Sequence, residues 1–87
     1  MMHVDILLFG AFRQFQSEPR LRIELPDRVT VGELRAALAD HAARHWQGCP
    51  AGLLPATAIA SEDSVLEDSA TVDAGSTLAL LPPVSGG

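Results

Sequence analysis

The sequence predicts an α+β domain in which one main helix packs across a small mixed sheet. Short stretches alternate apolar and polar residues with the period of a strand, and one longer stretch repeats apolar residues every three or four positions. A third observation is the ending LLPPVSGG, in which prolines precede two glycines. We therefore expect one domain over residues 1–81 and an extended, flexible C-terminal tail over residues 82–87.

The composition excludes several classes of function. The chain of 87 residues has a formal net charge of −5, with six arginines and no lysine, whereas nucleic-acid binding needs a basic surface. No stretch reaches the roughly 18 apolar residues of a membrane span, and the start lacks the basic flank of a signal peptide. We expect a cytoplasmic protein without a nucleic-acid or membrane partner.

Two strands are expected near the start of the chain. In residues 3–9, HVDILLF, the even-numbered positions are all apolar and share one face of a strand. Residues 20–25, RLRIEL, alternate in the same way and are followed by a proline. The two strands could form a hairpin around the link at residues 10–19.

The clearest local signal is the start of a helix. Thr30 and Glu33 form a capping box, in which each side chain accepts a hydrogen bond from the backbone amide of the other residue. The helix should begin at Val31 and end at residues 47–50, QGCP, where Gly48 can adopt the left-handed conformation and proline cannot continue a helix. Its apolar face is expected to comprise Val31, Leu34, Leu38, Ala42 and Trp46.

The second half of the chain gives weaker signals until its last strand. We expect two short strands within residues 51–73, one in the apolar run at 53–60 and one at 64–66. Residues 73–75, DAG, predict a turn, and residues 77–81 alternate as a final strand. This order of elements predicts a β-grasp fold, in which the first and last strands lie parallel at the centre of the sheet.

The tail has a composition suited to insertion and chemical activation. Pro82 and Pro83 favour an extended arm. Gly86 and Gly87 could pass through a channel too narrow for a side chain, and a terminal glycine carboxylate can be activated as an acyl-adenylate. Two glycines alone are weak evidence, because chain ends are commonly without consequence. The β-grasp order and the double proline make the pattern more specific.

Three stretches resemble the MoaD-type small subunits of molybdopterin synthase, which belong to the ubiquitin-like MoaD/ThiS sulfur-carrier superfamily. The ending LLPPVSGG, after DAGSTLAL, resembles the carboxyl end of these proteins. The opening ILLFGAFRQF resembles their first strand and the segment after it, and VTVGELRAALADHAARH resembles their helix. The resemblance covers most of the chain, with a poor match over residues 46–60.

The resemblance implies a sulfur carrier with no catalytic acid or base of its own and no bound cofactor or metal. Gly87, with Gly86 beside it, would be adenylated by an ATP-dependent adenylyltransferase of the ubiquitin-activating type and converted to a thiocarboxylate. A sulfurtransferase is a further implied partner. The tail would insert into the large catalytic subunit of a heterotetrameric molybdopterin synthase and pass sulfur to a pterin precursor of the molybdenum cofactor. The tail residues expected to bind this subunit are Pro82, Pro83, Val84 and Ser85.

The strand period also predicts an apolar patch on the outer face of the sheet. If the helix covers one face, then Leu7, Phe9, Ala79 and Leu81 face outward together, and Val65 could extend the patch. Such a patch usually marks a partner site, and the resemblance implies docking through this face. The alternative is that loops fold over these side chains.

Other reactive side chains have plainer explanations. Cys49 lacks a basic neighbour in the sequence that would lower its pKa, so a persulfide-bearing role is disfavoured. His41 and His45 are one helical turn apart, a spacing that metal ligands use, but no third ligand lies nearby in the sequence. The acidic turn residues lack the spacing of a calcium loop, and we interpret them as surface charge: Asp63, Glu67 and Asp68.

Three alternatives stay open. The chain could carry sulfur for another pathway, such as the synthesis of thiamine thiazole or cysteine, or the thiolation of transfer RNA. It could be a ubiquitin-like modifier that is joined through Gly87 to lysines of target proteins. It could also be a binding module in which the terminal glycines are incidental.

Overall fold

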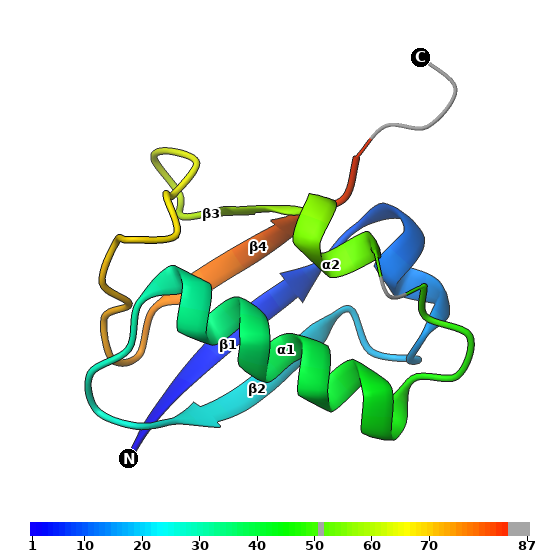
Figure 1. Cartoon of the computed structure of the whole chain (residues 1–87), viewed down its shortest axis with the longest axis horizontal. Helices are drawn as coiled ribbons and strands as arrows, with labels where there is room; N and C mark the ends of the chain where they lie inside the picture. The colour runs from blue at the N-terminus through cyan, green and yellow to red at the C-terminus, as the bar shows by residue number, and fades with distance from the viewer. Residues whose placement is uncertain (51, 84–87) are drawn as a thin grey trace.

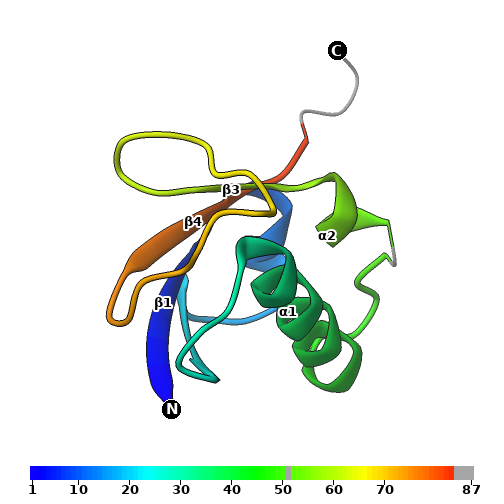
Figure 2. The ribbon, with the colours of Figure 1, turned by 60° about the vertical axis from the view of Figure 1, so that its left-hand side comes forward.

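The computed structural model describes residues 1–50 and 52–83, which form two layers: a mixed sheet and a helix packed across it (Figures 1 and 2). In chain order the elements are strand β1 (Met2–Leu8), 3-10 helix η1 (Gly10–Gln14), strand β2 (Arg20–Leu25), helix α1 (Val31–His45), helix α2 (Leu53–Ala56), strand β3 (Ala58–Ala60) and strand β4 (Thr77–Leu81).

The four-stranded sheet has the order β2-β1-β4-β3. Strand β1 pairs with β2 in the antiparallel sense and with β4 in the parallel sense, with Ile6 opposite Leu21 on one side and Leu78 on the other. Strand β3 runs antiparallel to β4, with Ile59 opposite Leu80. The first and last strands therefore lie side by side at the centre of the sheet, and the predicted α+β β-grasp architecture is confirmed.

Helix α1 begins as its sequence predicts. The Glu33 amide donates to the Thr30 hydroxyl over 3.2 Å, and the Thr30 amide donates to the Glu33 carboxylate over 3.0 Å, which completes the capping box. The helix ends at His45, and Gly48 adopts a φ of 75° just beyond it. Trp46 is the C-cap residue with extended backbone rather than part of the helix, yet its side chain is buried.

The core also holds Phe12, a residue that the strand and helix periods do not predict to be buried. Phe12 is completely buried, and its ring centroid lies 5.9 Å from that of Trp46 and 6.4 Å from that of Phe15. Phe12 reaches the core because residues 10–14 form η1, whereas the sequence predicts only a link there. A single 3-10 turn is too short to produce a detectable hydrophobic period. Most of the other core residues lie on the inward faces of β1, β4 and α1, and the core is completed by Leu25, Val29, Leu54, Ile59 and Val72.

The prediction of two short strands within residues 51–73 is half wrong. Residues 58–60 form β3, but residues 53–56 form α2, and Val65 makes only an isolated bridge to Ala60. The second strand stops short because the chain leaves the sheet to cap helix α1. There the amide of Gly32 donates to the Asp68 carbonyl over 2.9 Å. This bond gives a partner to an amide in the first turn of α1, which has none within the helix.

Arg35 joins three segments that are distant in the sequence. Its guanidinium donates to the carbonyls of Leu54, over 2.7 Å, and Thr57, at the end of α2, and to the Asp68 carboxylate over 3.1 Å. The side chain is only 18% exposed, so water screens these contacts weakly. Arg35 therefore holds α2 and the segment after β3 against α1.

Replacing Arg35 should destabilise the fold much more than replacing another arginine of the same helix. We expect Arg35→Ala to lower the free energy of unfolding by about 2 to 3 kcal/mol, because it leaves buried carbonyls without a charged donor. The matched control is Arg44→Ala, which removes an exposed ion pair with Asp40 and should cost no more than about 0.5 kcal/mol. Urea unfolding followed by circular dichroism measures both, and equal losses would contradict this role of Arg35.

Candidate functional site

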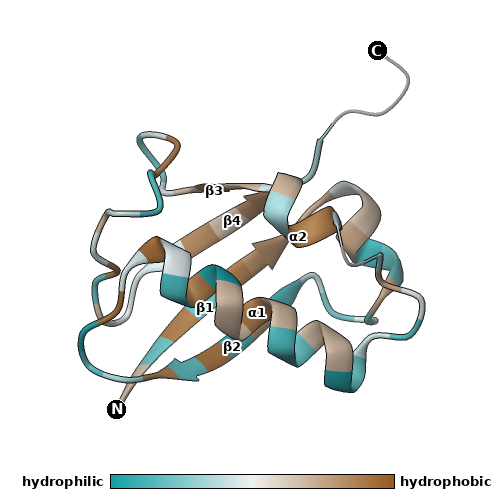
Figure 3. Ribbon diagram, viewed as in Figure 1, coloured by the Kyte–Doolittle hydropathy of each residue, from teal (hydrophilic) through white to brown (hydrophobic). Residues whose placement is uncertain are grey.

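The two central strands, β1 and β4, are largely hydrophobic along their length (Figure 3), and the face of the sheet that points away from α1 has an apolar centre. Strand register places Leu7 beside Ala79 and Ala79 beside Ala60, in one row across β1, β4 and β3. The next row contains Leu81 beside Ala58. Paired residues of neighbouring strands point to the same face, so these side chains adjoin one another.

The largest side chains of this face are open to solvent. Phe9, which continues β1 in extended conformation, is 44% exposed, Leu81 is 40% exposed and Val65 is 63% exposed. Val65 lies on the same face, because it bridges to Ala60. We call Leu7, Phe9, Val65, Ala79 and Leu81 the outer-face patch. The structure thus brings all five predicted residues together and leaves Phe9, Val65 and Leu81 exposed, while their role in binding stays a prediction.

Charged side chains border the patch on the side of β2. The Asp5 carboxylate accepts from the Arg22 guanidinium over 3.1 Å and lies 3.9 Å from that of Arg20. Farther along, His3 and Glu24 are 4.0 Å apart. A partner that covers the patch would therefore meet paired charges at its β2 border and apolar surface over β4 and β3.

The start of the tail packs against Gly10, a glycine to which the sequence pattern assigns no role. Gly10 has a φ of +57°, and a Cβ atom placed on it would lie 2.9 Å from Cγ of Pro82. Pro82 is half-buried, and Pro83 is exposed. The absence of a side chain at Gly10 therefore lets the proline pack where the chain leaves β4 (Figure 1). The only signal in the sequence is a glycine directly after the first strand. The predicted tail residues Val84, Ser85, Gly86 and Gly87 lie outside the described residues.

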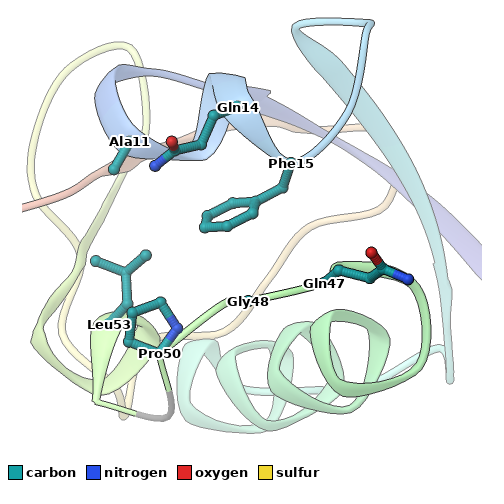
Figure 4. Close-up of a pocket in the computed structure, with 7 residues that line it drawn as sticks. All are labelled: Ala11, Gln14, Phe15, Gln47, Gly48, Pro50 and Leu53. Carbon is teal, nitrogen blue, oxygen red and sulfur yellow. The ribbon is translucent and has the colours of Figure 1, made fainter.

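An open hollow of about 330 Å³ lies next to this region, between η1 and the segment that follows α1 (Figure 4). Phe15 forms part of its wall and stacks on Trp46 with a ring separation of 5.4 Å. Gln14 and Gln47 also line it. None of the described residues that line the hollow carries a charge, so among them there is no candidate acid, base or nucleophile.

The reactive side chains of the domain lack the surroundings that would activate them. Burial raises the pKa of the Cys49 thiol, which keeps it protonated and weakly nucleophilic at neutral pH. Burial and the neighbouring His45 lower the pKa of His41, and Asp40 opposes them only in part. Within residues 1–50 and 52–83, histidine, cysteine and acidic side chains form no group of three that could hold a metal ion. Asp63 and Glu67 are exposed. Asp68, also exposed, pairs with Arg35.

No helix in the described part of the chain is both long enough and apolar enough to cross a membrane. The longest one, α1, has 15 residues and carries charged side chains along its exposed face.

The family comparison matches almost the whole chain. The model of the ThiS family matches residues 6–87, which includes the end of the first strand and the tail glycines. No curated protein matches the sequence.

Several solved structures share the fold over nearly their full length. Small archaeal modifier protein 1 of Haloferax volcanii is 21% identical with a TM-score of 0.70, over 97% of this chain and 100% of that one. A putative molybdopterin converting factor, subunit 1, of Pyrococcus furiosus is 22% identical with a TM-score of 0.70, over the same shares. A ubiquitin of Caldiarchaeum subterraneum is 21% identical with a TM-score of 0.64, over 99% and 98%. At these identities the likeness establishes the ubiquitin-like fold.

The contact between Gly10 and Pro82 can be tested with a second glycine as control. Gly10→Ala and Gly48→Ala both place a side chain at a positive φ, but only the first creates a clash, because no described atom lies within 4 Å of a Cβ at Gly48. We expect both to lose about 1 kcal/mol of stability from backbone strain, and Gly10→Ala to lose at least about 1 kcal/mol more. Urea unfolding measures the difference, and equal losses would show that Pro82 does not depend on Gly10.

Proposed function

Because the chain belongs to the ThiS family of ubiquitin-like sulfur carriers, we propose that it carries sulfur as a thiocarboxylate at Gly87 and serves as the small subunit of molybdopterin synthase. The observation that supports this proposal most directly is the family match, which extends through the tail to residue 87. The large catalytic subunit of the synthase, in a heterotetramer, would be its main partner.

The chemistry of the proposal takes place at the terminal carboxylate. A carboxylate oxygen of Gly87 attacks the α-phosphorus of ATP on an adenylyltransferase, which forms an acyl-adenylate and releases pyrophosphate. A hydrosulfide equivalent from a sulfurtransferase then displaces AMP, which leaves a thiocarboxylate and a proton. Glycine suits both steps because it has no side chain to hinder attack on the carbonyl carbon. ATP acts here as a substrate of the activating enzyme.

The role of the domain in this chemistry is to position the tail and not to supply catalytic groups. Strand β4 is paired on both sides, to β1 and β3, so the root of the tail is fixed to the centre of the sheet. Pro82 and Pro83 then limit the conformations of the arm, which lowers the entropy lost when a partner binds it. The outer-face patch includes Leu81, directly before the arm, so one partner could cover the patch and receive the tail at once.

Two features of the chain favour the molybdopterin branch over other sulfur-transfer pathways. The run PPVSGG resembles the carboxyl end of MoaD-type subunits. The structural neighbour from Pyrococcus furiosus is described as a putative molybdopterin converting factor subunit. Reconstitution of sulfur transfer with the large partner of each pathway would distinguish these possibilities.

A second candidate function is conjugation to other proteins. It is favoured by the neighbour from Haloferax volcanii, which is a small archaeal modifier protein. A modifier would use the same activated Gly87 but would end in an amide bond to a lysine of the target. Adducts that survive reduction and denaturation would support this function, whereas a thiocarboxylate alone would not.

The first prediction of this proposed function concerns the mass of the intact protein. After incubation with an active adenylyltransferase, ATP and a sulfur donor, the protein should gain the mass difference between sulfur and oxygen, and fragmentation should place the gain at Gly87. A variant that lacks Gly86 and Gly87 is the control and should gain nothing. No gain in the full chain, with an enzyme shown to be active, would favour the binding module.

The second prediction concerns docking through the outer-face patch. Phe9→Asp places a charge in the apolar surface and should abolish the complex with the large subunit, because burying that carboxylate without a partner is costly. Ala36→Asp, at an exposed position on α1, adds the same charge elsewhere and should leave the complex intact. Gel filtration measures complex formation, and circular dichroism confirms folding. An unimpaired complex with Phe9→Asp would rule out this docking face.

A further inference from the structure

The two edges of the sheet differ in how they are covered. Beside β3, the Leu66 amide donates to the Ile59 carbonyl over 2.8 Å, and Val65 bridges to Ala60. On the other edge, no strand of the described residues pairs with the outer side of β2. Open edge strands present backbone donors and acceptors that can pair with another strand.

The hydrogen bonds between β1 and β2 determine which backbone groups face this open edge. The Leu8 amide donates to the Pro19 carbonyl over 2.7 Å. Hydrogen-bonded and non-hydrogen-bonded residue pairs alternate along an antiparallel pair of strands, so Ile6 with Leu21 and Val4 with Ile23 are also hydrogen-bonded pairs. Ile23 and Leu21 therefore direct their amides and carbonyls toward β1. Arg22 and Glu24 direct theirs outward, away from the sheet.

The two residues of β2 whose backbone groups face outward, Arg22 and Glu24, carry opposite charges, so two copies of this strand can pair with complementary charges. If a second copy of β2 lies antiparallel and is centred on Ile23, Arg22 of one copy faces Glu24 of the other, and the reverse holds across the two-fold axis. A shift by two residues in one direction still pairs Arg20 with Glu24 but places Arg22 opposite Arg22. A shift in the other direction places Glu24 opposite Glu24. Like charges directly opposite one another destabilise a strand pair. Charge thus selects the register centred on Ile23.

The same register agrees with the side chains on the inner face. It places Ile23 opposite Ile23 of the second copy, and Leu21 opposite Leu25. Leu21 and Ile23 are only partly buried in one chain, and both pack against the core. Pairing would bury more of them and extend the apolar layer from one copy to the next.

The ends of the strand limit how far the pairing extends. In this register Arg20 faces Pro26 of the second copy, which has no amide to donate. The Arg20 carbonyl already accepts from the Gln16 side chain over 3.1 Å. Only the Arg20 amide and the Pro26 carbonyl could still pair there, so the full exchange of two hydrogen bonds is confined to the Arg22 and Glu24 positions.

We propose that the protein forms a two-fold symmetric dimer through the edge of β2, in which Arg22 of each copy pairs with Glu24 of the other. The sheet then continues across both copies. The outer-face patch lies over β1, β4 and β3, so both patches stay accessible in the dimer. The inference rests on the edge strand and is independent of the sulfur chemistry.

Charge reversal tests the register. Arg22→Glu makes both outward positions acidic, and Glu24→Arg makes both basic, so neither variant can self-associate in this register. Each should raise the dissociation constant of the dimer at least about tenfold. Mixed together, the two variants restore both opposite-charge pairs and should form a heterodimer. Sedimentation equilibrium over a range of concentrations measures self-association, and native mass spectrometry identifies the heterodimer.

A backbone variant tests the edge itself and does not depend on charge at position 22, where Arg22→Glu would also lose the ion pair with Asp5. Glu24→Pro removes an outward amide while leaving the bonds between β1 and β2 in place, so it should prevent dimerisation in a folded protein. Phe9→Asp, on the outer-face patch, should leave the dimer unchanged. A monomeric wild type, a dimer that persists in Glu24→Pro, or mixed charge variants that do not associate would each overturn the proposal.

Discussion

The parallel pairing of β1 and β4 is the constraint on which the rest of the structure depends. The Asp5 amide donates to the Ser76 carbonyl over 3.0 Å, and the Gly75 amide donates to the His3 carbonyl over 3.0 Å, so the two strands are aligned from their first residues. This alignment places the first and last strands side by side, so the intervening segments must close a loop between them. It also decides which side chains of both strands face α1.

The same pairing explains why the tail and the outer-face patch adjoin. Because β1 and β4 are parallel, Phe9 and Leu81 leave the sheet at the same end, and Gly10 meets Pro82 just beyond them. If β1 and β4 were antiparallel, the end of β1 would lie beside the start of β4, away from the tail. A site made of an arm and a docking surface therefore follows from the direction of two strands, without any residue that acts as an acid or a base.

The sheet also separates its surfaces by chemistry. The outer face is apolar over β4 and β3 and bears paired charges over β2, where Asp5 joins the guanidinium groups of two arginines. The β3 edge is covered by the segment that follows it, and the β2 edge is open. Binding to the face and pairing at the edge can thus occur on one small domain without overlap.

The sequence by itself determined the elements whose cause is local. Neighbouring residues alone produce the Thr30 capping box and the alternation of apolar and polar residues in β1, β2 and β4, so the sequence predicts both. The glycines and prolines of the tail are likewise read directly from the sequence. The outer-face residues were predictable for the same reason, since a period of two residues assigns each side chain to a face.

Tertiary structure decided what depends on contacts between distant residues. Phe12 is buried because Trp46 and Phe15 lie against it, and Arg35 is a structural residue because two later segments present their oxygens to it. Val65 forms a bridge rather than a strand because the following residues cap α1. The role of Gly10 depends on Pro82, which lies far away in the sequence. No local sequence pattern predicts such contacts, because they contribute free energy only after folding has brought the distant residues together.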